Sequence, residues 1–222
     1  MTSRLLPRLK NELKRAQDQD DDTYVLDYDE SDLTSFHAVI RAPVDSLYAH
    51  TFIRLKIAIP DDYPYSPPRV HFVNHNSTRI HPNLYANGKV CLSILNTWEG
   101  PPWAPTMSID KVLRTVQSLL DYEPMTYEPG QSDNPAFNHY VEREKWNTLL
   151  LSYLKYETQP VLREYMITRT LKAQHQIVDQ MKAQEGVRMP DGRIMYQHTT
   201  PMNGLALWEK IQEECQKSSS AQ

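Results

Sequence analysis

The chain has 222 residues, of which 40% are hydrophobic, and its 24 Lys and Arg against 28 Asp and Glu give a formal net charge of −4. This composition suffices for a hydrophobic core, and the mild acidity gives no reason to expect a nucleic acid as partner. No apolar run approaches the length of a membrane span, and "MTSRLLPRLKNELKRAQ" at the start contains no apolar signal core, so no membrane partner is expected.

The two cysteines, Cys91 and Cys215, lie far apart and form no close-spaced pair. This usage is typical of a reducing compartment, where thiols are catalytic or inert rather than bridged. We therefore expect the chain in the cytoplasm or the nucleus.

The first half of the chain predicts one helix followed by short strands. Leu5, Leu6, Leu9 and Leu13 stand at helical spacing, and the acidic run 18–22 should end that helix as a solvated loop. The segments "SFHAVIRAP", "HTFIRLKIAIP" and "RVHFV" are rich in β-branched residues, and the second alternates in character. We expect about four strands, the last in "RVHFV", following one another as an antiparallel meander.

After Cys91 the pattern becomes helical. Ser108 is a candidate N-cap for a helix with one apolar stripe in "SIDKVLRTVQSLLD". One or two helices follow in 134–157, then a long one from Pro160 to about Glu185, a break at Gly186 and at residues 190–192, and a last helix in "GLALWEKIQEECQK" before a frayed tail. This order predicts an α+β domain with a helical C-terminal extension.

Cys91 lies in "HPNLYANGKVCLSILNTWEGPPW", residues 81–103, and three interpretations compete. Between Val90 and Leu92 it could be a small buried hydrophobic residue. A zinc site would need further close-spaced ligands, which are missing, so no metal is expected. A cysteine hydrolase would need a histidine base held by a carboxylate or amide, and no local signature marks any of the eight histidines for that role.

A fourth interpretation follows from the turn between Asn83 and Cys91. Asn87-Gly88 is a strong tight-turn signal, which would bring those two side chains together. An asparagine amide is a neutral donor that can stabilise an oxyanion in acyl transfer. A thiol with such a donor, but without an adjacent histidine base, suits the transfer of an already activated acyl group to an amine.

Four ordered segments resemble the ubiquitin-conjugating enzyme family and its UBC fold. They are "RAPVDSLYAHTFIRLKIAIP", "IPDDYPYSPPRVHF", "HPNLYANGKVCLSIL" and "WAPTMSIDKVLRTVQSLL". The resemblance implies a UBC core domain over residues 1–157, with an N-terminal helix, a four-stranded antiparallel meander and C-terminal helices, and a helical extension over 158–222. The long Leu-to-Trp connection and "YEPG" resemble a larger branch of the family.

The resemblance implies a role for each residue of the Cys91 segment. Cys91 falls on the thioester-forming cysteine, and Asn83 on the asparagine that supports the oxyanion or braces the loop. His81, Pro82 and Leu92 support the site. Glu128 and Tyr127 compete for the role of positioning or deprotonating the incoming lysine. Ser93 replaces a common aspartate.

The resemblance also implies partner surfaces. Tyr65, Ala104 and Pro105 match loops gripped by ligases, and Arg8 and Lys10 match basic positions used with the activating enzyme and ligases, although Asn11 stands where a basic residue is usual. The implied partners are ubiquitin or a ubiquitin-like modifier, an activating enzyme, a ligase and protein substrates. We expect a monomer without a cofactor.

The implied activity is acceptance of the modifier as a thioester on Cys91 and its transfer to a substrate lysine. The main alternative is a catalytically inactive UBC-fold module that binds or scaffolds. Such modules lack the cysteine, so Cys91 in an intact frame argues against it.

Overall fold

The computed structural model describes residues 5–18, 22–187 and 203–217. It begins with helix α1 (Leu5–Gln17) and continues with strands β1 (Tyr24–Asp29), β2 (Asp32–Arg41), β3 (Phe52–Ala58) and β4 (Arg69–Phe72). The helices that follow are α2 (Ile109–Ser118), α3 (Pro135–Trp146), α4 (Ser152–Tyr156), α5 (Pro160–Lys172), α6 (Gln174–Ala183) and α7 (Gly204–Gln216). In this description no helix is long and apolar enough to cross a membrane.

The four strands form one antiparallel sheet in chain order, which confirms the predicted meander. A row of buried side chains crosses all four strands, because the register pairs Leu26 with Ala38, Ala38 with Leu55 and Leu55 with Phe72. The period of two along each strand therefore sends one set of side chains into a common core.

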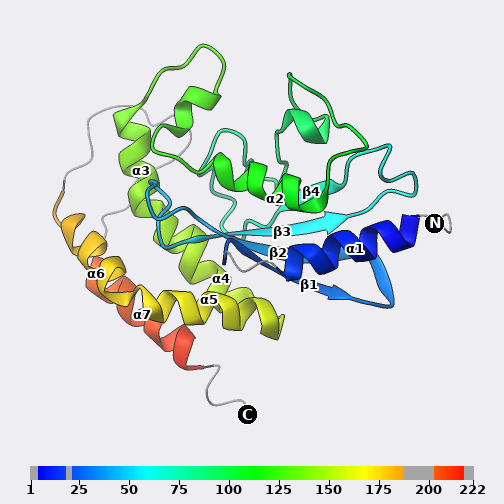
Figure 1. Cartoon of the computed structure of the whole chain (residues 1–222). Helices are drawn as coiled ribbons and strands as arrows, with labels where there is room; N and C mark the ends of the chain where they lie inside the picture. Colours follow the sequence, from blue (N-terminus) through cyan, green and yellow to red (C-terminus); the bar gives the residue numbers. More distant parts are fainter. Residues whose placement is uncertain (1–4, 19–21, 188–202, 218–222) are drawn as a thin grey trace.

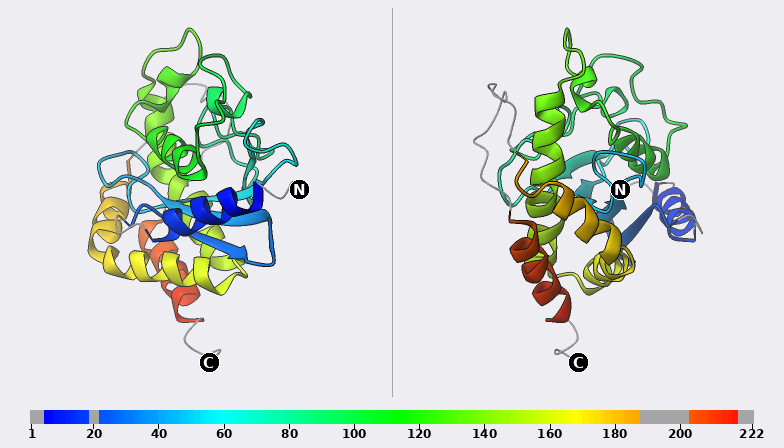
Figure 2. Two further views of the ribbon diagram at one scale, coloured as in Figure 1. Left: turned by 45° about the vertical axis from the view of Figure 1, so that its right-hand side comes forward. Right: turned by 90° about the vertical axis from the view of Figure 1, so that its left-hand side faces the viewer.

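Helices cover both faces of the sheet, as Figures 1 and 2 show. Helices α1 and α2 pack against each other and against β2, whereas α5 packs against β1 and β2 from the other side, where the rings of Tyr165 and Phe52 meet edge to face at 6.2 Å. Helices α6 and α7 pack together, and α7 also contacts α4 and the turn before it. The helices beyond residue 157 thus share one hydrophobic cluster with the sheet.

Several predicted elements differ in detail from the structure. Of the leucines in the first helix, Leu9 and Leu13 are buried but Leu6 is half exposed, and the Leu5 side chain lies outside the described part. Helix α1 ends at Gln17, before the acidic run, whose residues 19–21 are likewise not described.

The predicted long helix from Pro160 to Glu185 is instead two helices, because the backbone leaves helical geometry at Ala173 (φ −98°, ψ 11°). Helices α3 and α4 are joined by a π-helical turn, Asn147–Leu151, so they follow one another without a loop. The predicted turn at 190–192 and the frayed tail at 218–222 fall outside the described residues.

Helix α2 begins as predicted. The Ser108 side chain accepts a hydrogen bond from the Lys111 N–H at 3.3 Å, and Asp110 stands in the first turn, where it complements the helix dipole. The buried apolar stripe of α2 turns toward the sheet, and the chain after it leads into the loop that carries Glu128.

Candidate active site

The predicted turn before Cys91 forms and brings Asn83 beside it. The Cys91 N–H donates to the Asn83 carbonyl at 2.9 Å, and Gly88 closes the turn with φ +87°. A Cβ on Gly88 would meet the imidazole of His71 at 2.0 Å, so both the backbone angle and the close approach require glycine.

The Asn83 side chain braces the backbone of the cysteine. Its Nδ2 donates to the Cys91 carbonyl at 2.8 Å, while its Oδ1 is buried without a hydrogen-bond partner. One of the two amide hydrogens is therefore engaged with the backbone of the cysteine, which favours the bracing role. Pro82, between Asn83 and His81, is buried like both of them.

His81 is locked in one tautomer. Its Nδ1 accepts from the Asn83 N–H at 3.0 Å, so its Nε2 carries the proton and donates to the Leu119 carbonyl at 2.9 Å. Burial lowers the pKa of His81 to about 3. The ring is therefore neutral, has no free nitrogen, and cannot serve Cys91 as a base.

Cys91 itself is fully buried, with 0% of its surface exposed, and Leu92 beside it is 6% exposed. The loop that follows closes on this segment. Thr97 Oγ1 accepts from the Leu92 N–H at 2.9 Å and donates to the Val90 carbonyl at 2.7 Å, so that one hydroxyl bridges the residues on both sides of the cysteine. The closed site leaves the thiol no route to a large substrate.

Glu128 and Tyr127, the two candidates for the lysine-activating role, have different surroundings. The Tyr127 hydroxyl donates to Asp121 at 2.9 Å, and burial raises the pKa of Tyr127 to about 12, so this phenol is a neutral structural group. Glu128 is partly exposed and lies 3.4 Å from the guanidinium of Arg79. Arg79 also donates to the Pro82 carbonyl at 2.7 Å, which links the Glu128 loop to the Cys91 loop.

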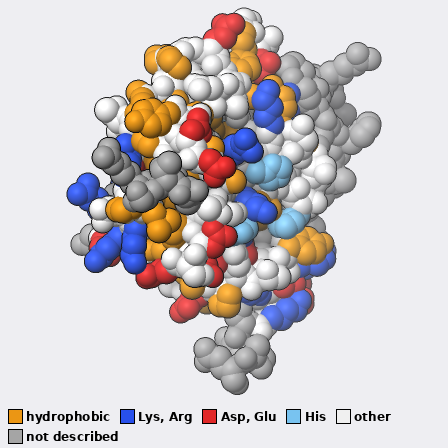
Figure 3. All heavy atoms as spheres, turned by 90° about the vertical axis from the view of Figure 1, so that its right-hand side faces the viewer, with side chains coloured by type: hydrophobic (Ala, Val, Ile, Leu, Met, Phe, Trp, Pro, Cys, Tyr) orange, Lys and Arg blue, Asp and Glu red, His pale blue; other side chains and the backbone are white. Residues whose placement is uncertain are grey.

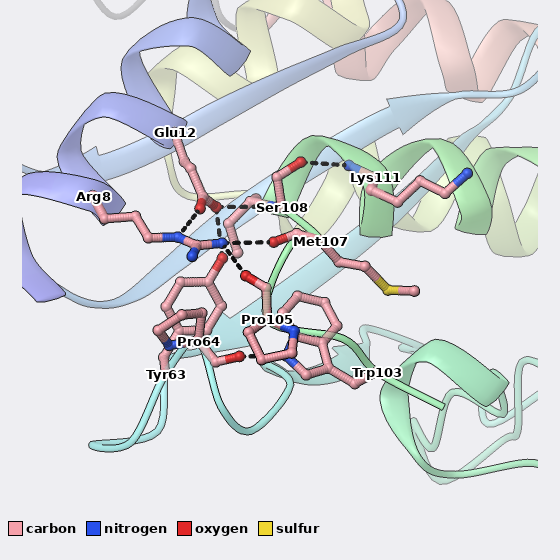
Figure 4. Close-up of polar contacts among 10 residues, drawn as sticks. Arg8, Glu12, Tyr63, Pro64, Trp103, Pro105, Met107, Ser108 and Lys111 are labelled. Atoms are coloured by element: carbon pink, nitrogen blue, oxygen red, sulfur yellow. Dashed lines mark hydrogen bonds and ion pairs between the residues drawn. The ribbon is translucent and has the colours of Figure 1, made fainter. Parts of the chain in front are cut away.

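Arg8, predicted to contact partner proteins, is partly exposed and also forms bonds within the chain (Figure 4). Its guanidinium donates to the Pro105 carbonyl at 2.7 Å, to the Met107 carbonyl at 2.9 Å and to Glu12 at 2.7 Å. Glu12 in turn accepts from the Tyr63 hydroxyl at 2.6 Å. Arg8 thus ties α1 to the loop of Ala104 and Pro105 and shapes that surface from beneath.

The other predicted partner residues are accessible. Tyr65 is 79% exposed, Pro105 is exposed, Ala104 is partly exposed, and Lys10 forms an exposed ion pair with Glu30 at 3.2 Å. On the face that Figure 3 shows, hydrophobic side chains gather toward one side and lie next to both acidic and basic groups.

Cys215 follows the polar residues Glu213 and Glu214 in the sequence, yet it is buried in α7, and burial raises the pKa of its thiol to about 11. The amphipathic packing of α7 through Leu207, Trp208 and Ile211 accounts for this difference.

Sequence reasoning missed three residues that shape the site: Thr97, Arg79 and Glu12. Thr97 and Arg79 form no recognisable motif with the residues they hold. Glu12 stands four residues after Arg8, a spacing that suggests a helical ion pair but not its bonds to Tyr63 and to the start of α2.

Comparisons with known proteins identify similar sequences and a similar fold. A sequence model of the family described as "Ubiquitin-conjugating enzyme" matches residues 8–148. "Ubiquitin-conjugating enzyme E2 Z" of Danio rerio is 40% identical over 135 residues, which cover 57% of this chain and 41% of that protein. "Dual E2 ubiquitin-conjugating enzyme/E3 ubiquitin-protein ligase BIRC6" of Homo sapiens is 47% identical over 109 residues, 46% of this chain and 2% of that protein.

A crystal structure of a ubiquitin-conjugating enzyme homologue from Plasmodium yoelii matches with a TM-score of 0.53 at 25% identity, covering 67% of this chain and 97% of that one. The predicted fold is confirmed, and the E2 Z relatives represent the larger branch of the family that the sequence was predicted to resemble. The chain spans only about two fifths of the length of the E2 Z relative from Danio rerio.

Proposed function

The chain belongs to the ubiquitin-conjugating enzyme family, and on that premise we propose that it accepts ubiquitin or a ubiquitin-like modifier on Cys91 and passes it to a lysine of a protein substrate. The observation that supports this most is the pairing of Cys91 with Asn83 in one braced loop, next to a histidine that is neutral and fully engaged. Transfer from an activated thioester does not require a histidine base at this site, whereas a thiol hydrolase needs one.

The reaction has two acyl transfers. The Cys91 thiolate attacks the thioester carbonyl of the modifier on the activating enzyme, a new S–C bond forms, and the activating enzyme's thiolate leaves. The substrate amine then attacks the same carbonyl, an amide bond forms and the Cys91 thiolate leaves. The proton lost by the amine goes to water or to Glu128, which we propose orients the lysine as well.

The Asn83 amide keeps the Cys91 backbone in place through both steps, and His81 and Pro82 hold Asn83. We propose that an activating enzyme and a ligase bind the α1 surface around Lys10 and the loops of Tyr65, Ala104 and Pro105. The chain would act as a monomer in the cytoplasm or nucleus.

A catalytically inactive binding or scaffold module is the second candidate, and the complete burial of Cys91 favours it. Incubation with ATP and a panel of activating enzymes and modifiers distinguishes the two. The enzyme should give an adduct on a non-reducing gel that disappears with reductant and is absent in Cys91→Ser, which can leave a more stable oxyester. No adduct with any modifier would support the binding module.

A further inference from the structure

The loop after the cysteine is anchored at both ends and exposed between them. Asn96 starts it in left-handed geometry (φ +56°), and its side chain accepts from the Trp103 N–H at 3.0 Å. Trp103 is buried, and its indole N–H donates to the Pro64 carbonyl at 2.7 Å. Residues 96–102 between these anchors are all exposed. A segment with fixed ends and few buried contacts is the kind that opens locally at low cost.

Three contacts hold this exposed segment closed, and one of them is the backbone hydrogen bond from the Thr97 N–H to the Leu92 carbonyl at 3.2 Å. The Thr97 hydroxyl makes the two hydrogen bonds that flank Cys91, to the Leu92 N–H and the Val90 carbonyl. Gly100, with φ +127°, lies so close to Ser93 that a Cβ there would be 3.0 Å from the Ser93 Cβ. The small Ser93 side chain, in place of a common aspartate, leaves room for this approach.

The closed arrangement cannot perform acyl transfer. A reacting sulfur and carbonyl carbon must approach to about 3–3.5 Å, and the carbonyl carries a protein behind it. Because Cys91 is 0% exposed, that approach requires a movement of its neighbours. The neighbours before it, Asn83 and His81, are buried and bonded into the core, whereas the exposed segment after it is not.

We propose that Asn96–Pro102 is a lid over Cys91, that Thr97 is the residue that positions and latches it, and that the thiol reacts from an open-lid state. As regards acyl transfer, this inference rests on the proposed function. The claim that Thr97 protects the Cys91 thiol does not depend on any modifier. In the charging reaction, lid opening would be the contribution that a partner protein supplies.

Alkylation of the intact chain by iodoacetamide tests the lid directly. Timed quenching and peptide mass spectrometry give separate rates for Cys91 and Cys215 in the same molecule. Thr97→Val keeps the shape of the side chain but removes the hydroxyl, so Cys91 should be labelled about 5- to 160-fold faster, the factor that two hydrogen bonds of ordinary net strength represent. Thr97→Ser keeps the hydroxyl and should remain close to the wild-type rate.

Two controls separate lid opening from other effects. Thr168→Val, on the exposed surface of α5, should leave both rates unchanged. Cys215 reports on general loosening, because it is buried in α7. Across pH 7–9 an open lid raises the Cys91 rate by one constant factor, whereas an altered thiol pKa would change the shape of the profile. Gly100→Ala provides a second route to the open state and should also accelerate labelling.

The inference is overturned if Thr97→Val labels Cys91 no faster than wild type, if Thr97→Ser is as fast as Thr97→Val, or if Cys215 accelerates in parallel. Charging by an activating enzyme, measured alongside, shows which proposal has failed. If the chain forms no thioester with any modifier and Thr97→Val still accelerates the labelling of Cys91, only the proposed function is contradicted. A chain that is charged normally, with a Cys91 rate insensitive to Thr97, contradicts the lid alone.

Discussion

Acid should destabilise the protein through His81. Its pKa is about 3 in the folded chain against 6.5 for a free histidine, because burial disfavours the imidazolium. Protonation would also place a second hydrogen opposite the Asn83 N–H, which now donates to Nδ1 at 3.0 Å. The unfolded chain therefore binds this proton more readily than the folded one, and the stabilisation, complete above pH 6.5, is lost as the pH falls toward 3.

The size of the effect follows from the gap between the two pKa values. Between pH 7.5 and pH 5 the folded chain stays unprotonated while the unfolded chain gains the proton, which is worth up to about 1.4 kcal/mol per pH unit below pH 6.5, or about 2 kcal/mol over the whole interval. Most carboxylates remain ionised in this range. His37, His50 and His75, whose pKa values burial also lowers, titrate in the same direction.

The assay is urea unfolding at pH 7.5, 6.5, 5.7 and 5.0 for wild type, His81→Gln and His175→Gln. The other histidines contribute equally to each protein, so the difference in unfolding free energy isolates one ring. His81→Gln should be less stable than wild type at pH 7.5, and the gap should narrow by about 2 kcal/mol at pH 5. The exposed His175 should show no such narrowing. A gap that stays constant from pH 7.5 to pH 5 would refute the reasoning.

Four further changes test the site. Asn83→Ala leaves the buried Cys91 carbonyl without its donor and should lower the free energy of unfolding by about 1–3 kcal/mol, or the melting temperature by roughly 2–10 °C. An unchanged melting curve together with hundredfold slower transfer to lysine would instead support the role of Asn83 as an oxyanion donor. Glu128→Gln should slow single-turnover discharge onto free lysine most at pH 6.5 and least at pH 9.5, with loading unaffected, whereas a uniform loss would indicate orientation alone. Arg8→Lys has a single nitrogen, which cannot replace the Nε bond to Glu12 together with the Nη2 bonds to the Pro105 and Met107 carbonyls, and should lower the melting temperature nearly as much as Arg8→Ala; equal stability of Arg8→Lys and wild type would contradict this. Cys215→Ser should leave charging intact, and an adduct lost with this variant would move the reactive thiol to α7.

Local patterns were enough to predict most of the fold. The alternation in β3 and the apolar stripe of α2 are set by burial on one face, which repeats along the chain. The break at Ala173 was missed because the helical pattern continues through it and no proline or glycine marks it. The burial of Cys215 was missed because the polar residues of α7 conceal a narrow apolar stripe.

The site was less accessible to sequence reasoning than the fold. The Asn87-Gly88 turn is a two-residue signal, and it correctly brought Asn83 to Cys91. Arg8 and Thr97 both donate hydrogen bonds to backbone carbonyls. Because every residue has such a carbonyl, the sequence does not indicate which one a side chain will bind. The sequence predicted a partner contact for Arg8 and gave no sign of the internal bonds that this side chain makes.

The placement of α5 across the sheet also affects how the chain folds while it is being made. Strand β1 ends at Asp29 and α5 begins at Pro160, so 160 − 29 = 131 positions separate two elements that pack together. At roughly 5–20 residues per second, the ribosome needs about 7–26 s to deliver the second after the first. Once β4 is complete at Phe72, the Phe52 side of the sheet lacks the cover of α5 for the rest of that interval, and the nascent chain needs shelter from aggregation until Tyr165 arrives.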